Sequence, residues 1–136
     1  MEAKVEPKFK DETRLKDEYS QLLSKNKELH DMITDICTYC KDAFTKDVVI
    51  TMIYRSDEEQ EAIYKDDPKY KVRKFKSPHQ FWHSVDLRSR TFEATEIEKL
   101  VSYINGKYND TNTYKWTARN HDIGLGDHFH LQYCKK

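Results

Sequence analysis

A change in the spacing of apolar residues near position 48 limits what this chain can fold into more than any other feature. Before that point, apolar residues recur every three or four positions, as they do on a helix that buries one face. Residues 48–54 then form a short apolar, β-branched run that is typical of a buried strand. A chain of 136 residues has room for one core that helices and strands share. The sequence therefore predicts an α+β fold, with a small antiparallel sheet and flanking helices.

The same periodicity assigns each element. Helices are expected over residues 11–27, 26–44, 57–64 and 95–108, and strands over 48–54, 84–88, 114–118 and 128–133. The first two helices could instead be one long bent helix, although Asn26 suits the N-cap of a second helix, as Ser56 suits that of the third. Loops are expected over residues 66–77, which are basic, and 119–127, which contain glycine, and residues 1–10 are expected to be a disordered tail.

Charge and hydropathy exclude several classes of function. The 24 Lys and Arg residues balance the 24 Asp and Glu residues, whereas a nucleic-acid-binding protein usually has a basic excess. No apolar run approaches the roughly 20 residues that a membrane span needs. The charged N-terminus has no apolar segment after it, so we expect no signal peptide and synthesis in the cytoplasm.

The three cysteines do not indicate a disulfide framework, because their number is odd and no secretory signal precedes them. Cys37 and Cys40 have the spacing of a redox or zinc pair, but both fall on the apolar stripe of an expected helix and no second pair exists. We expect them to be small buried core residues.

Histidines and carboxylates gather in the second half of the chain. Five of the six histidines follow residue 78, in the groups His79/His83 and His121/His128/His130, with Asp86 and Asp127 beside them. Zinc is bound by His and carboxylate ligands, and a catalytic zinc site has three protein ligands and one open position. Strand alternation places His128 and His130 on one face and Phe129 on the other. Spacing alone leaves open whether these groups converge on a metal or are surface histidines.

Three motifs occur in the order found in one family of zinc peptidases. Residues 77–86, Ser-Pro-His-Gln-Phe-Trp-His-Ser-Val-Asp, resemble the Ser-x-His-x-x-Gly-x-Ala-x-Asp motif of the D-Ala-D-Ala carboxypeptidase and L-alanyl-D-glutamate endopeptidase family, which has the hedgehog/DD-peptidase fold. Residues 127–130, Asp-His-Phe-His, resemble the closing motif of that family, and residues 51–60 resemble its Ser-Gly-Tyr-Arg-Ser segment. The resemblance spans about residues 48–133 and is carried by the ordered set, because each motif alone is weak.

The resemblance implies a role for each matching residue. It implies one Zn²⁺ per chain, bound by His79, Asp86 and His130, with Asp127 as the catalytic carboxylate. Arg55 matches the arginine that binds substrate and stabilises the developing anion, and this chemistry suits a guanidinium. His128 matches a histidine near the metal that is usually not a ligand, and we count it with Asp127 and Arg55 among the catalytic residues. Ser77 and Gln60 match supporting positions.

The chain departs from the family pattern at several positions. Trp82 stands in place of the motif glycine and Ser84 in place of the motif alanine, while Met52 and Ile53 replace the serine and glycine of the upstream motif. His79 and His83 are four apart, the spacing of a helical zinc pair, but the strand expected from residue 84 leaves no room for that helix. We therefore favour His79 with Asp86, and expect His83 near the site or at the surface.

The resemblance predicts a zinc metallopeptidase that hydrolyses a bond in the peptidoglycan stem peptide, like a phage endolysin that reaches the cell wall after holin-mediated release. We expect a monomer whose residues 11–136 form one domain, with a helical part over 11–44 and a catalytic core over 45–136. The alternative is a catalytically silent zinc-binding module that binds wall peptide or a partner protein, with residues 11–44 as the partner surface. A third option is a dipeptidase acting on free D-Ala-D-Ala.

Overall fold

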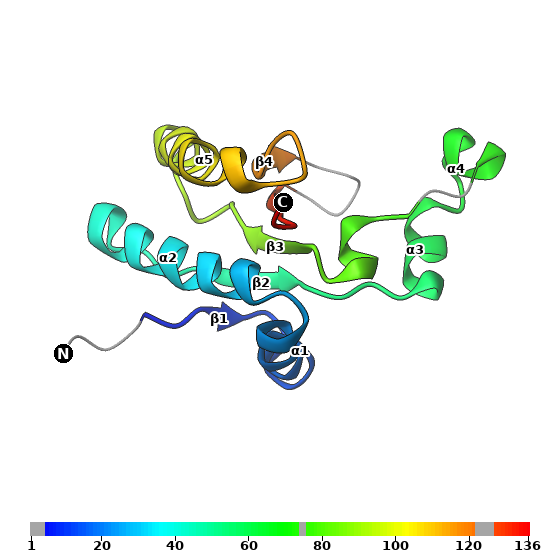
Figure 1. Cartoon of the computed structure of the whole chain (residues 1–136), viewed down its shortest axis with the longest axis horizontal. Helices are drawn as coiled ribbons and strands as arrows, with labels where there is room; N and C mark the ends of the chain where they lie inside the picture. Colours follow the sequence, from blue (N-terminus) through cyan, green and yellow to red (C-terminus); the bar gives the residue numbers. More distant parts are fainter. Residues whose placement is uncertain (1–4, 74–75, 122–126) are drawn as a thin grey trace.

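A five-stranded mixed sheet runs through the computed structural model, which describes residues 5–73, 76–121 and 127–136 (Figure 1). The strands, in the spatial order β1-β2-β3-β5-β4, are β1 (Lys8–Phe9), β2 (Val49–Met52), β3 (Ser84–Arg88), β5 (His128–Gln132) and β4 (Ala118–His121). The helices within these ranges are α1 (Glu12–Lys25), α2 (Lys27–Phe44), α3 (Asp57–Tyr64), α4 (Pro68–Val72) and α5 (Ala94–Tyr108), with 3-10 turns η1 (Pro78–Phe81) and η2 (Asn109–Thr111). The α+β class is therefore as predicted.

The sheet is mixed rather than antiparallel, because β1 runs parallel to β2. The amide of Lys8 donates to the carbonyl of Val48 at 2.8 Å, and the amide of Lys10 donates to that of Ile50 at 2.9 Å. Phe9 packs against Tyr19 of α1, with ring centroids 5.7 Å apart. These contacts order Lys8–Phe9, although this strand lies within the segment that was expected to be a disordered tail.

Asn26 separates the first two helices, which resolves the alternative of one bent helix. Its side chain accepts from the amide of Leu29 and so caps α2, while its own amide closes α1 by donating to the carbonyl of Leu22. The Asn26 side chain also donates to the carbonyls of Trp82 at 3.1 Å and Tyr133 at 2.8 Å. The junction is therefore tied to residues that flank the two strands of the candidate site, because Trp82 precedes β3 and Tyr133 follows β5.

Two other expectations need correction. Residues 68–72 of the expected basic loop form α4, because Asp67 caps it and Pro68 occupies its first turn. The strand expected over 114–118 begins only at Ala118 and continues to His121. Within residues 114–118, asparagine side chains accept hydrogen bonds from the backbone amides. The Asn112 side chain accepts from the amide of Tyr114, and the Asn105 side chain accepts from the amides of Thr117 and Ala118. The rest of the expected glycine loop, residues 122–126, lies outside the described residues.

The core lies on one face of the sheet. Alternation along β3 and β5 directs Val85, Leu87, Phe129 and Leu131 into it, and each is buried. Helices α2 and α5 supply the opposing apolar side chains, which include the buried Cys37 and Cys40 as expected. Burial raises the pKa of both thiols to about 12, so they are inert packing residues. The other face of β3 and β5 carries the polar side chains described next.

Candidate metal centre

The register of β3 and β5 brings the two halves of the predicted ligand set together. Asp86 lies opposite His130, and Arg88 lies opposite His128, so these four side chains share the face of the sheet away from the core. His79 reaches the same place from η1, which Ser77 caps and Pro78 begins. His79 and His130 are 51 positions apart in the sequence and meet at Asp86, because η1 leads into β3 and β3 pairs with β5.

Asp86 is the centre of this group. Its Oδ1 lies 3.1 Å from Nε2 of His79 and 3.1 Å from Nδ1 of His130. The three side chains are buried, and their candidate ligand atoms all lie within 4.8 Å of one another. A buried group of two imidazoles and one carboxylate at this separation could hold a metal ion. We call it the metal triad below.

Each of the two rings has an outer nitrogen with a partner away from Asp86 and an inner nitrogen that faces Asp86. Nδ1 of His79 lies 2.9 Å from the carbonyl oxygen of Ile53, which can only accept, so the neutral ring carries its proton there. Its buried Nε2 makes no hydrogen bond, although it faces Asp86. Nε2 of His130 lies 3.0 Å from Oγ of Ser84, which can accept its proton. Metal-binding histidines characteristically donate their other ring proton to such partners.

Electrostatics favour an ionised Asp86. Burial by itself would raise the pKa of its carboxyl group, but the adjacent imidazoles of His79 and His130 outweigh burial and lower the pKa below its usual range. The triad therefore offers one carboxylate and two imidazole nitrogens that face it, each 3.1 Å from its Oδ1. Such electron-rich atoms repel one another unless a proton or a cation lies between them, and this donor set matches the preference of Zn²⁺.

A cleft of about 550 Å³ opens beside Asp86. Its lining consists of Lys10, Thr51, Met52, Asp86, Arg88, Arg90, Asp127 and His128. The candidate base Asp127 is exposed, so it can meet both solvent and a ligand in this cleft. His128 is buried with its Nε2 3.6 Å from Oδ2 of Asp86, and it does not belong to the metal triad.

Arg55 is almost fully buried, with 1% of its surface exposed. One Nη donates to Oε1 of Gln60 at 2.9 Å, and the other lies 3.1 Å from Sδ of Met52, which lines the cleft. Its Nε makes no hydrogen bond, and no carboxylate in the described ranges lies within ion-pair distance. A buried charge without a counter-charge is costly, so the environment of Arg55 suits an incoming anion.

The two remaining histidines of the predicted groups are not part of the triad as described. His83 is outside the triad, with Nδ1 3.0 Å from the hydroxyl of Tyr114, as expected for a residue near the site or the surface. The side chain of His121 lies outside the described residues. Sequence reasoning missed the contact of Ser84 with His130, and it named neither Arg88 nor Lys10. The period of two along β3 could have placed Ser84 and Arg88 on the face of Asp86.

Comparisons with protein-family models, with curated proteins and with solved structures found no match. Among the described residues, no helix has the length and apolar character that a membrane crossing requires.

Proposed function

We propose that this chain is a zinc-dependent peptidase that hydrolyses a bond in the peptidoglycan stem peptide, similar to the carboxypeptidase and endopeptidase family that its motifs resemble. The observation that carries the proposal is the buried metal triad, in which His79 and His130 each turn a ring nitrogen toward the carboxylate of Asp86, 3.1 Å from its Oδ1. The substrate class is that of the resembled family. The three motifs support it because each of them falls on an element that builds this site.

Residues around the triad have roles that fit peptide hydrolysis. A bound Zn²⁺ would supply Lewis-acid chemistry, since it acidifies water and polarises a carbonyl. Asp127 takes a proton from the attacking water and delivers it to the leaving amine, which requires an exposed carboxylate in the same cleft. Arg55 donates hydrogen bonds to the oxygen that becomes negative as the carbonyl is attacked. Gln60 holds the Arg55 guanidinium through its 2.9 Å bond.

The setting proposed for this activity is that of an endolysin. The enzyme acts as a monomer on the bacterial wall, after release from the cell in which it is made. The bond is an L-alanyl-D-glutamate bond or a D-Ala-D-Ala bond, the two types that the resembled family hydrolyses. The exact bond is read from the fragments in the experiment below.

The test combines metal content with product analysis. Wild-type protein is stripped with a chelator, reconstituted with Zn²⁺, and incubated with purified muropeptides whose fragments are identified by mass spectrometry. We expect one zinc per chain and one new cleavage, both lost with the chelator. His79→Ala should lose the zinc, whereas the matched control His30→Ala, on α2 and against Tyr19, should keep it.

Each outcome separates the candidate functions. Full zinc content in His79→Ala would remove this residue from the ligand set. Zinc binding without any cleavage would favour the silent module. In that case, a partner would bind the exposed side of residues 11–44, because Leu15, Leu22, Leu29 and Ile33 are buried in the core.

A further inference from the structure

Two stacked aromatic rings and the first helix line a groove outside the metal centre. Tyr54 lies between β2 and α3, Trp82 ends η1, and both side chains are half-buried. Their rings stack with centroids 5.0 Å apart at 22°. Both rings line a groove of about 620 Å³, together with residues of α1 that include Asp17 and Gln21. Aromatic and polar surfaces therefore meet in this groove, which we call the aromatic groove.

Hydrogen bonds hold the backbone that carries both rings. The amide of Tyr54 donates to Oε1 of Glu18 at 3.0 Å, and the carbonyl of Tyr54 accepts from one Nη of Arg14 at 3.0 Å. The carbonyl of Trp82 accepts from the side chain of Asn26 at 3.1 Å. A site whose walls are fixed before binding loses less conformational entropy when a ligand enters. The aromatic groove is therefore organised in advance of binding.

The charged residues of the aromatic groove favour a neutral ligand over an anion. Its described lining includes one cation, Arg14, and two carboxylates, Asp17 and Glu18. The Arg14 guanidinium is neutralised by Glu18 at 2.7 Å and by Glu59 at 2.9 Å. An anionic ligand would therefore meet carboxylates without a cation left to bind it.

Asp17 and Gln21 can bind hydroxyl groups. They are exposed and four residues apart on α1, and Nε2 of Gln21 donates to Oδ2 of Asp17 at 2.8 Å. A carboxylate accepts up to about four hydrogen bonds, and the amide keeps a second donor hydrogen and its carbonyl oxygen. A pyranose ring fits such a pair beside an aromatic surface, because its C–H bonds form an apolar face that packs on an aromatic ring while its hydroxyls project from the edge.

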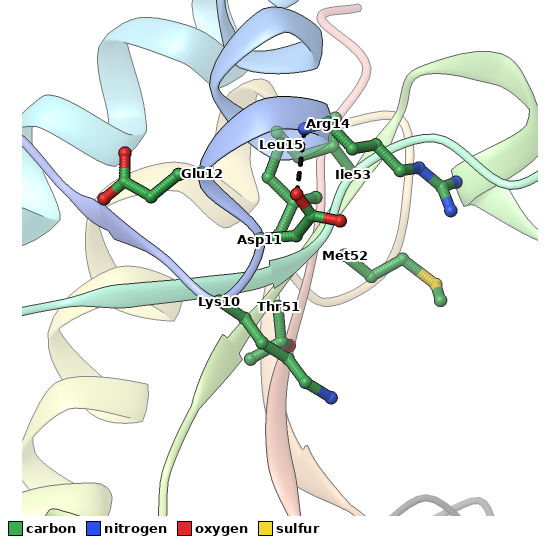
Figure 2. A pocket seen from close by; sticks show the side chains of 8 residues that line it. All are labelled: Lys10, Asp11, Glu12, Arg14, Leu15, Thr51, Met52 and Ile53. Carbon is green, nitrogen blue, oxygen red and sulfur yellow. Dashed lines mark hydrogen bonds between the residues drawn. The ribbon is translucent and has the colours of Figure 1, made fainter.

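A neighbouring pocket joins the aromatic groove to the cleft beside the metal triad. This pocket, of about 530 Å³, shares Arg14 with the groove and shares Lys10 and Met52 with the cleft. Figure 2 shows Lys10, Arg14 and Met52 extending to the same side of the pocket. A polymer can therefore lie along one surface, with a ring in the aromatic groove and another part beside the triad.

We propose that the aromatic groove binds a neutral N-acetylhexosamine ring of the wall glycan, so that the preferred substrate is a stem peptide still joined to its glycan strand. This inference rests on the proposed peptidase function and specifies the form of its substrate. The resembled motif has glycine where this chain has Trp82, so the aromatic platform is a feature of this chain. Trp82 is held at a φ of 62°, and backbone strain of this kind clusters at ligand-binding sites.

Binding is measured first, without hydrolysis. Tri-N-acetylchitotriose, a peptide-free and uncharged analogue of the glycan, is titrated into the zinc-reconstituted protein in a calorimeter, and a glycan-free stem tetrapeptide is titrated beside it. The variants are Trp82→Ala, Trp82→Phe and Asp17→Ala, the last at an exposed position where folding is not at stake. The matched control is Tyr39→Ala, which breaks a second stacked pair, Tyr39 on Tyr103 at 4.0 Å and 11°, away from the aromatic groove.

We expect the wild type to bind the saccharide. Trp82→Ala and Asp17→Ala should each bind it about 10-fold more weakly, the scale of one lost aromatic contact or one lost hydrogen bond to a charged group. Trp82→Phe keeps an aromatic ring and should bind nearly as well as the wild type, as should Tyr39→Ala. A stem peptide linked to a disaccharide should also show a higher kcat/KM than the free peptide, and Trp82→Ala should reduce this ratio.

Three outcomes would overturn the glycan site. They are a wild type that does not bind the saccharide, saccharide binding that is unchanged in both Trp82→Ala and Asp17→Ala, and binding of the free tetrapeptide that depends on Trp82, which would assign the groove to peptide. The glycan site and the peptidase function fail separately. Cleavage of the free peptide without saccharide binding would retain the peptidase and remove the glycan site, whereas saccharide binding without cleavage of either peptide would do the reverse.

Discussion

Trp82 occupies the position at which the resembled motif has glycine, and its backbone explains that preference. Its φ is 62°, in the left-handed region, where a β-carbon is strained. The residue ends η1 and precedes β3, so it makes the turn between His79 and Asp86. Its ring stacks on Tyr54 with centroids 5.0 Å apart at 22°. We expect this contact to offset the strain of the backbone.

Substitution of Trp82 by alanine and by glycine separates the two effects. Both remove a half-buried aromatic ring and its stacking, at a cost of about 2–3 kcal/mol. Alanine keeps the strained φ, whereas glycine relieves about 1–2 kcal/mol of strain. Glycine also loses about 0.5–1 kcal/mol more backbone entropy on folding. Trp82→Gly should therefore be more stable than Trp82→Ala by roughly 0.5–1 kcal/mol.

Urea unfolding of the two variants measures this difference. A second pair, Ser102→Ala and Ser102→Gly on the exposed face of α5, provides the control. There the order should be reversed, with glycine less stable than alanine by about 1 kcal/mol. If alanine were also the more stable substitution at position 82, the strain argument would be refuted. Zinc content should stay at one per chain in Trp82→Gly, because His79 and Asp86 are unchanged.

Three further predictions concern single side chains. Arg55→Lys should already lower kcat/KM because it loses the guanidinium fork, and Arg55→Ala should cost about 2–4 kcal/mol of transition-state stabilisation; unchanged kcat/KM in the alanine variant would exclude Arg55 from the mechanism. Asp127→Ala should keep its zinc but lose turnover of muropeptides by at least ~10²-fold, and a wild-type rate would leave Asp127 as a turn residue. Burial raises the pKa of Asp35, but hydrogen bonds from Tyr108 and Lys107 outweigh burial and lower the pKa below its usual range. Its ionised form therefore stabilises the fold above its unfolded pKa of about 3.9, and this contribution is lost as the pH falls through the lower folded pKa. Urea midpoints measured from pH 7 to pH 3 should show Asp35→Asn less stable than wild type at neutral pH, with the gap closing in acid; a gap independent of pH would contradict this reasoning.

Periodicity predicted those elements that bury a long apolar stripe. The expected helix over 26–44 differs from α2 by one residue, and the expected strand over 84–88 coincides with β3. The strand β1 could not be predicted, because a two-residue strand has too few side chains to show an alternating pattern. It exists through its backbone bonds to β2, and a partner in space is not visible in a local pattern.

Local sequence patterns also predicted only part of the candidate site, and the rest depends on contacts between distant segments. The face shared by His128 and His130 followed from strand alternation, whereas their meeting with Asp86 required the register of β3 against β5. The grouping of the histidines made His79 a candidate ligand, but its place beside Asp86 and His130 was expected only because its motif resembled that of a family. Lys10 gave no signal in the sequence, since an exposed lysine is ordinary and its place in the cleft depends on β1.

The central pair of strands couples the site to the stability of the fold. The same five residues of β3 bury Val85 and Leu87 in the core on one face and present Asp86 to the imidazoles on the other. A ligand that binds only the folded chain stabilises it by mass action, so a metal at the triad would hold β3 against β5. Loss of activity in a chelator can thus reflect loss of the fold as well as loss of chemistry. Unfolding curves recorded with and without the chelator distinguish the two, because a chain that is still fully folded in the chelator before urea is added has lost only the chemistry of the metal.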